Sequence, residues 1–255
     1  MNPAISVRNL TKSYAEPVLR GVDLDVRAGE IVGYIGPNGA GKSTTIKILM
    51  GMIPDFSGDV TVLGRDVRTD ALEIKRRVGY VPENAALYEV LTPAEFLRFI
   101  GRLYGMDDAV IRRKAGDLLQ LVGLADQIDS RMNTFSKGMR QKVLLIAGLI
   151  HNPEIVFLDE PLSGLDANAV ILVKEILARL KEAGKTIFYS SHLMDVVEKI
   201  SDRIVILSQG RIIANGTFEE LKSQVHSGSL EGIFQGLTGD DSTSARASEF
   251  FQALQ

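Results

Sequence analysis

The chain has 255 residues, of which 45% are hydrophobic, so it can bury a full core as one large α/β domain or two small ones. Its formal net charge of -3 gives no basic field to attract a phosphate backbone, so we expect no nucleic-acid partner. The absence of cysteine excludes disulfides, thiolate metal sites and a thiol nucleophile, and it suits a reducing cytosol.

The ends and apolar runs of the chain predict a cytoplasmic protein. Residues 1–10 hold no charged region followed by an apolar stretch, so no signal peptide is expected. The longest apolar run, Val143 to Ile150, is too short to span a bilayer. Any membrane role must therefore depend on a partner.

Strand-like runs rich in Val and Ile recur along the chain, and helical stretches lie between several of them. This alternation predicts an α/β fold. The runs are Ile5–Val7, Ile31–Ile35, Val60–Val62, Val78–Val81, Ile155–Leu158, Thr186–Ser190 and Ile204–Leu207.

We expect residues 84–150 to form an inserted helical subdomain between two parts of a core, 1–83 and 151–220, because that segment holds no convincing strand. Its first helix is marked by a capping box with proline at the first helical position, at Thr92, Pro93 and Glu95. One apolar face follows at helical spacing and is expected to be core: Phe96, Phe99, Ile100 and Leu103. Residues 221–255 are expected to form a short C-terminal extension that ends in a frayed polar tail.

A glycine-rich loop follows the run Ile31–Ile35 and satisfies the GxxxxGK[ST] pattern in a strand-to-helix context. Its residues are Gly36, Pro37, Asn38, Gly39, Ala40, Gly41, Lys42, Ser43 and Thr44. The glycines let backbone N–H groups point inward, and the following helix presents its positive end, so the loop forms an anion cradle. Lys42 adds a point charge for the outer phosphates, and Ser43 offers a hydroxyl to Mg²⁺. The loop predicts a nucleotide site.

A second strand-like run, Ile155–Leu158, ends in two acids, Asp159 and Glu160, at a sheet edge beside the expected phosphates. Asp159 suits binding of Mg²⁺ through water, and Glu160 suits general-base activation of an attacking water. A hydrophobic strand ending in acids can also be a plain loop boundary. The neighbouring motifs favour a functional site, because the segment Pro161–Asp166 follows directly and His192 follows a later strand.

The segment Phe135–Gln141 leads into a helix, and with it the order of motifs resembles the ABC ATPase family over nearly the whole chain. The resemblance implies a P-loop NTPase core of ABC type with an antiparallel β subdomain, and Mg²⁺-dependent hydrolysis of ATP. It implies that Glu160 is the catalytic carboxylate and that His192 is the switch histidine at the γ-phosphate. Three further nucleotide contacts follow from it in the family's LSGGQ signature: Ser136, Gly138 and the next residue, Met139.

Tyr14 resembles the family's aromatic residue that stacks on adenine, although an ordinary strand-end tyrosine is a fair competing interpretation.

Two departures from the commonest family pattern narrow the subgroup. Glu83 stands where many members have Gln, and the signature reads Ser-Lys-Gly-Met in place of Ser-Gly-Gly-Gln. Both side chains, Gln and Glu, offer an oxygen to Mg²⁺, so Glu83 is expected to bind the metal together with Ser43 and Asp159. Both variants resemble the single-domain ATPases of two-component exporters of drugs, antibiotics, sodium and polysaccharides, which favours export.

The resemblance also implies partners. A serine at a helix start offers a hydroxyl, backbone N–H groups and the positive helix end to a γ-phosphate. Ser136 and Gly138 would act in trans, on a nucleotide held by a second chain, in a homodimer or a close heterodimer. A separate transmembrane permease would hold the chain at the inner face of the cell membrane.

Two alternatives stay open at this point. One is a non-transport ABC ATPase that serves a soluble assembly complex. The other is a nucleotide-sensing module that turns ATP over poorly, against which Glu160 and His192 argue.

Overall fold

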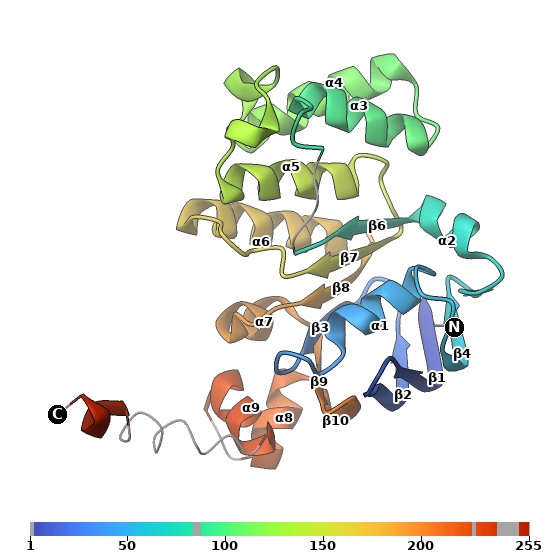
Figure 1. Ribbon diagram of the computed structural model, residues 1–255, viewed down its shortest axis with the longest axis vertical. Helices are drawn as coiled ribbons and strands as arrows, with labels where there is room; N and C mark the ends of the chain where they lie inside the picture. Colours follow the sequence, from blue (N-terminus) through green and yellow to red (C-terminus); the bar gives the residue numbers. More distant parts are fainter. Residues whose placement is uncertain (1–2, 84–87, 226–227, 239–249, 255) are drawn as a thin grey trace.

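The computed structural model describes residues 3–83, 88–225, 228–238 and 250–254. A six-stranded sheet runs through the middle of the molecule in the order β10-β9-β3-β8-β7-β6 (Figure 1). All neighbouring strands in it are parallel except β10, which pairs antiparallel with β9. The strands are β3 (Ile31–Ile35), β6 (Val78–Val81), β7 (Ile155–Asp159), β8 (Thr186–Ser190), β9 (Arg203–Ser208) and β10 (Arg211–Gly216).

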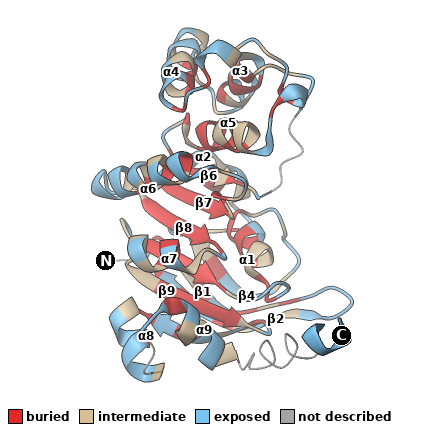
Figure 2. Ribbon diagram, turned by 90° about the vertical axis from the view of Figure 1, so that its left-hand side faces the viewer, coloured by how far each residue is buried: buried red, intermediate tan, exposed pale blue. Residues whose placement is uncertain are grey.

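Both faces of this sheet are covered, which is why its central strands read as continuous hydrophobic runs. In β3, Ile31 and Ile35 pack into the core cluster on one face, and Val32 and Tyr34 pack into the cluster on the other. The alternation follows the period of two residues of a β-strand. Figure 2 accordingly shows the strands of this sheet as the buried centre of the molecule.

A second sheet, four-stranded and antiparallel, has the order β2-β1-β4-β5. Its strands are β1 (Ile5–Ser13), β2 (Pro17–Val26), β4 (Ser57–Val62) and β5 (Arg65–Asp66). It confirms the antiparallel subdomain. Three strands were not among the runs predicted from the sequence: β2, β5 and β10. The signal in β2 was alternation, because Leu19, Val22, Leu24 and Val26 are buried and mostly separated by exposed residues.

Helices fill the chain between β6 and β7, and the described part of that segment, 88–150, contains no strand. The helices are α3 (Pro93–Leu103), α4 (Asp108–Leu121), α5 (Lys137–Leu149), and two short 3₁₀ turns, η1 (Ala125–Gln127) and η2 (Met132–Thr134). They form a layer at one end of the molecule in Figure 1. The predicted capping box of α3 is present: the backbone N of Glu95 donates to Thr92 Oγ1 at 3.2 Å, and the N of Thr92 donates to the Glu95 carboxylate at 2.9 Å.

The apolar face of α3 is core only in part. Phe96 is buried, but Phe99 is 40% exposed and Leu103 is 68% exposed, so the prediction of one core face was wrong for these two residues. The helix packs on α4 and α5. The apolar face of α3 is wider than its contact with α4 and α5, so Phe99 and Leu103 remain exposed.

The remaining helices are α1 (Lys42–Leu49), α2 (Ala71–Arg77), α6 (Ala167–Glu182), α7 (Met194–Ile200), α8 (Phe218–Val225) and α9 (Leu230–Thr238). Leu221 of α8 and Leu230 and Ile233 of α9 are fully buried in the main core. Most of the predicted polar tail, residues 239–249 and 255, lies outside the described residues. Among the described helices, none combines the length and the apolar content that crossing a membrane requires.

Candidate nucleotide site

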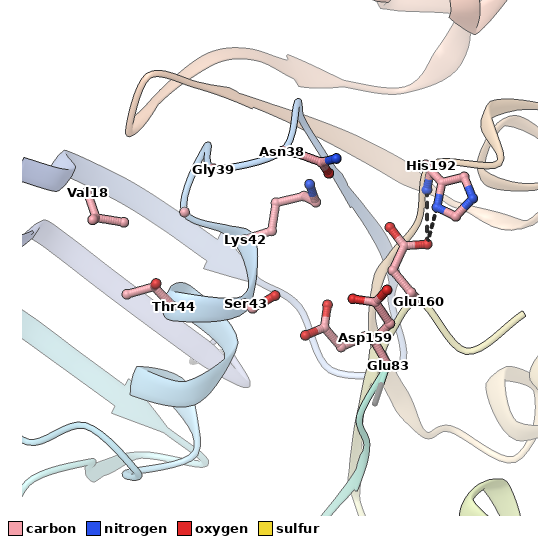
Figure 3. Close-up of a pocket in the computed structure, with 11 residues that line it drawn as sticks. Val18, Asn38, Gly39, Lys42, Ser43, Thr44, Glu83, Asp159, Glu160 and His192 are labelled. Carbon is pink, nitrogen blue, oxygen red and sulfur yellow. Dashed lines mark hydrogen bonds and ion pairs between the residues drawn. The ribbon is translucent and has the colours of Figure 1, made fainter. Parts of the chain in front are cut away.

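The carboxyl ends of four parallel strands bring the predicted site residues together. Because β3, β8, β7 and β6 are consecutive neighbours and parallel, the residues that follow them meet at one edge of the sheet. The glycine-rich loop follows β3, Asp159 ends β7, and His192 and Glu83 come two residues after β8 and β6. They line a cavity of about 680 Å³, in which the acids face Lys42 and Ser43 (Figure 3).

The glycines of the loop are required by close packing. A Cβ at Gly36 would lie 2.2 Å from the carbonyl oxygen of Leu207 in β9. Gly41 has a φ of 110°, and a Cβ there would lie 2.6 Å from the side chain of Leu19. A larger residue at Gly36 would clash with the backbone of β9, and a larger residue at Gly41 would be strained by that positive φ. The loop therefore delivers the chain tightly into α1, whose first residues line the cavity.

Lys42 supplies the positive charge of the cavity. Its ammonium donates to the carbonyl oxygens of Gly36 at 2.7 Å and Pro37 at 3.2 Å. Burial lowers the pKa of Lys42, and the carboxylates of Glu160, Asp159 and Glu83 oppose that shift. The cation thus lies at the start of α1, where the helix dipole adds to its attraction for phosphate.

Two strands hold Asp159. The carboxylate is buried, and its Oδ1 accepts a hydrogen bond of 2.6 Å from the hydroxyl of Ser190, its partner in the pairing of β7 with β8. The negative charge of Asp159 also contributes, after burial, to raising the pKa of Tyr80 to about 12. The side chain of Asp159 is therefore held in place in the lining of the cavity.

Glu160 is placed by an uncommon backbone conformation. Its φ of 50° lies in the left-handed region, which residues other than glycine rarely adopt. Its Oε2 lies 2.7 Å from Nδ1 of His192 and accepts from the backbone N of His192 at 3.2 Å. Only 12% of the Glu160 side chain is exposed, whereas 66% of the His192 side chain is exposed. Non-glycine residues held in this region often mark functional sites.

Three predicted loop residues lie outside the cavity lining: Gly36, Pro37 and Ala40. Pro37 and Ala40 shape the loop, in which the backbone N of Ala40 donates to the Pro37 carbonyl at 3.1 Å. The other loop residues Asn38, Gly39, Ser43 and Thr44 do line it. So does Val18, which the sequence pattern did not predict as a site residue. The one sequence feature that could have identified Val18 is its position at the start of β2, four residues after Tyr14.

The signature residues do not line the cavity of their own chain. Ser136 is the exposed N-cap of α5, and its Oγ accepts a hydrogen bond of 3.2 Å from the backbone N of Met139. Gly138 lies against the next segment of chain, because a Cβ there would come within 2.8 Å of the carbonyl oxygen of Gly164. The positive end of α5 is thus presented on a surface outside this cavity.

Tyr14 lies in the turn between β1 and β2, is 59% exposed, and does not line the cavity either. The ammonium of Lys12 lies 4.8 Å from the centre of its ring and donates to Asp55 at 2.9 Å. One neighbour of the ring is therefore a cation.

The oxygen donors of the cavity fit Mg²⁺. That ion binds through one or two carboxylates together with substrate phosphates, and Ser43, Asp159 and Glu83 supply a hydroxyl and two carboxylates. Within the described part of the chain, no group of three or more His, Cys, Asp or Glu side chains could hold a metal by itself. The donor set therefore fits a metal that arrives with phosphate oxygens.

Comparison with known proteins agrees with this geometry. Residues 19–163 match the ABC transporter family. The chain is 37% identical over 222 residues to the linearmycin resistance ATP-binding protein LnrL of Bacillus subtilis, covering 87% of this chain and 71% of that protein. The chain spans 88% of the length of the ABC transporter ATP-binding protein NatA of Bacillus subtilis. It spans 57% of the length of the ABC transporter ATP-binding protein sll0415 of Synechocystis sp..

Two solved structures share the fold. An ATP-binding subunit of an ABC transporter superposes with a TM-score of 0.86 at 35% identity, covering 92% of this chain and 99% of the other. The dimeric post-hydrolysis ATP-binding cassette MJ0796, bound to ADP and Pi, superposes with a TM-score of 0.79 at 25% identity, covering 84% of this chain and 98% of the other. The chain belongs to the ABC transporter family and is an ATP-binding ATPase of that family.

Proposed function

We propose that two copies of this chain, or one copy and a close relative, close around two ATP molecules and drive a separate transmembrane permease that exports its substrate. One observation carries the proposal. The cavity gathers the loop with Lys42 and Ser43 opposite three carboxylates, while Ser136 lies outside it. Each chain therefore offers a phosphate cradle and, on another surface, a phosphate clamp.

Within one chain, the residues divide the work of hydrolysis. The loop and Lys42 bind the β- and γ-phosphates. Ser43, Asp159 and Glu83 would hold Mg²⁺, which would supply positive charge for the phosphate oxygens. Glu160 orients the attacking water and accepts its proton. His192 holds the Glu160 carboxylate in place through Nδ1, leaving its other ring nitrogen free for the γ-phosphate.

The second chain completes the site. The exposed start of α5, with the Ser136 hydroxyl and the N–H groups of the first turn, suits a γ-phosphate held by a partner's loop. Since each chain carries one cradle and one clamp, a head-to-tail pair satisfies both at once. The dimeric cassette with ADP and Pi among the structural neighbours supports this arrangement.

An apolar groove between the helical layer and the sheet supports a membrane partner. It measures about 510 Å³ and includes Leu103 and Phe96 of α3, Tyr104, Met52 and Leu72. Lys75 and Arg76 also line it. We assign it to a short cytoplasmic helix of the permease, with apolar residues for the groove and an acid for Lys75. Leu103, the more exposed of the two apolar side chains of α3, then has a partner. The relative named for linearmycin resistance supports outward transport.

The ATPase part is tested by phosphate release from the purified chain and from Lys42→Ala, with binding of a fluorescent ATP analogue measured in parallel. We expect hydrolysis that depends on Mg²⁺ and on protein concentration, and none in the variant. Hydrolysis that is independent of protein concentration would argue against the dimer.

The permease part is tested by affinity purification of the tagged chain from detergent-solubilised membranes of its source cells, with Leu103→Asp as the groove variant. Leu121→Asp serves as a matched control, because Leu121 is equally exposed, at 71%, and does not line the groove. We expect an integral membrane protein to co-purify with the wild type and the control but not with Leu103→Asp. Soluble partners alone would favour the assembly-complex alternative.

A further inference from the structure

Lys137 connects the start of α5, which carries the signature, to the segment that follows β7. It is the first residue of α5, and its ammonium donates to Oγ of Ser163 at 2.7 Å. Its methylene chain lies over Gly164, because a Cβ on that glycine would come within 2.8 Å of Lys137 Cδ. Lys137 stands where the signature that this segment resembles has glycine, so the contact comes from a residue in which this chain departs from that pattern.

Ser163 is in turn tied to Glu160. Its backbone N donates to the Glu160 carbonyl at 3.1 Å, which closes a four-residue turn directly after β7. Gly164 continues the turn with a φ of 77°. Because the turn is tight and begins at Glu160, a displacement of Ser163 is passed to the backbone that carries the Glu160 carboxylate.

A backbone contact runs beside the side-chain contact. Gly138 lies so close to Gly164 that a Cβ would meet its carbonyl oxygen at 2.8 Å. The start of α5 and the turn after Glu160 therefore touch at two points, one through Lys137 and one through Gly138. The element that clamps a partner's nucleotide and the element that activates water at the chain's own nucleotide are mechanically connected.

We propose that Lys137 is a positioning residue that couples the two ATP sites of the dimer, an inference that rests on the proposed action of Ser136 in trans. When ATP of the partner pulls the start of α5 into place, Lys137 carries Ser163 and the Glu160 turn with it. Closure at one site then sets the base at the other, and hydrolysis is cooperative in ATP.

The hydrogen bond between Lys137 and Ser163 is exposed to solvent, which limits its strength. Lys137 and Ser163 form a single hydrogen bond near solvent, and such bonds contribute on the order of a 3- to 10-fold change in an equilibrium or rate. We therefore expect a graded loss of coupling when the link is broken, with hydrolysis still measurable.

The test uses the full-length chain with Lys137→Met, Lys137→Arg, Ser163→Ala and the double variant Lys137→Met/Ser163→Ala. Methionine keeps most of the apolar packing on Gly164 and removes the donor, whereas arginine keeps a donor. Arg179→Met is the control, because Arg179 makes an exposed ion pair with Glu182 at 2.8 Å in the last turn of α6. Rates are measured against ATP concentration, with binding to the monomer measured separately.

We expect the wild type to show a Hill coefficient above 1. Lys137→Met and Ser163→Ala should each lower kcat by about 3- to 10-fold and bring the Hill coefficient to about 1, with monomer ATP affinity unchanged. The double variant should be no worse than either single one, because both remove the same contact. Lys137→Arg should keep the cooperativity of the wild type, because arginine still donates a hydrogen bond. Arg179→Met should behave as wild type.

Each contrary result has its own meaning. If Lys137→Met loses activity while Ser163→Ala stays normal, the ammonium acts on a phosphate and the coupling inference is wrong. If both variants match the wild type, or the wild type has a Hill coefficient of 1, the inference also fails. A wild type that neither hydrolyses ATP nor dimerises refutes the proposed function instead, so the two failures are distinguishable.

Discussion

Glu160 and His192 meet at one atom: Oε2 of Glu160 lies 2.7 Å from Nδ1 of His192 and 3.2 Å from its backbone N. The backbone N of Glu160 donates to the carbonyl of Ser190 at 3.1 Å, so both ends of the residue are fixed by the chain around β8. The carboxylate is thereby oriented before any water arrives, and its role and that of His192 can be tested separately.

Glu160→Gln should bind Mg-ATP and hydrolyse it slowly. The amide keeps the shape and can still accept from the His192 backbone, but it cannot take the water's proton, and a general base contributes about 10²- to 10⁴-fold. The ATP-bound dimer should accumulate, which size-exclusion chromatography with ATP can measure. Turnover near that of the wild type in a phosphate-release assay would contradict the assignment of Glu160 as the base.

His192→Ala should lower turnover by about 10- to 100-fold, because the Glu160 carboxylate loses its side-chain partner and positioning errors of this kind are costly. Monomer ATP binding should persist, since Lys42 and the loop are untouched. A fluorescent ATP analogue measures binding beside the turnover assay. Equal loss of binding and turnover would show that His192 acts mainly in holding nucleotide and contributes little to orienting Glu160.

The sequence predicted the cavity well because its residues follow strands. The loop, Asp159, Glu83 and His192 come at the ends of hydrophobic runs or within two residues of them, and parallel strands bring such ends to one edge. The resemblance to the family also implied that Ser136 acts outside that cavity, but the sequence could not predict that Lys137 contacts Ser163, because that contact depends on how α5 packs against a segment 26 positions further along the chain. Spacing along a chain carries no information on contacts of that kind.

The fold was predictable where burial is two-sided. β3 and β7 are continuous hydrophobic runs because both of their faces are covered, so they were predicted as strands. In β2 buried and exposed residues alternate, and this strand was not predicted. The face of α3 shows the converse limit. Helical periodicity identifies apolar residues on one side, but not whether the chain itself covers them, and Leu103 is left exposed.

Ser136→Arg should leave ATP binding to the monomer almost intact while abolishing ATP-driven dimerisation, because Ser136 lies outside the cavity of its own chain. Arginine places a bulky side chain at the start of α5, where the partner's γ-phosphate would lie. Analytical ultracentrifugation with and without ATP measures the dimer. A Ser136→Arg protein that hydrolyses ATP normally by itself would refute action in trans.

Mixing gives a sharper test of the same point. Ser136→Arg and Lys42→Ala are each expected to be inactive. A mixed dimer keeps one composite site that has both Lys42 and Ser136 intact. Activity should therefore return when the two inactive proteins are combined, and a mixture as inactive as its parts would argue that both residues serve one chain.

Glu83 tests how charge in the cavity governs the need for metal. Its carboxylate lines the cavity with those of Asp159 and Glu160, so a γ-phosphate there is repelled unless Mg²⁺ lies between the charges. Glu83→Gln keeps an oxygen for the metal and removes one negative charge. It should retain substantial ATPase activity and saturate at lower free Mg²⁺ than the wild type.

Glu83→Ala is the companion variant, since it removes both the charge and the ligand. It should mainly uncouple hydrolysis from the permease, because Glu83 follows β6 and precedes the helical layer that carries the apolar groove. The measurement is the ATPase rate against free Mg²⁺ for the three proteins, with and without the membrane partner. Unchanged Mg²⁺ dependence in Glu83→Gln would remove the charge argument, and complete loss of its basal hydrolysis would mean that the carboxylate takes part in the chemistry itself.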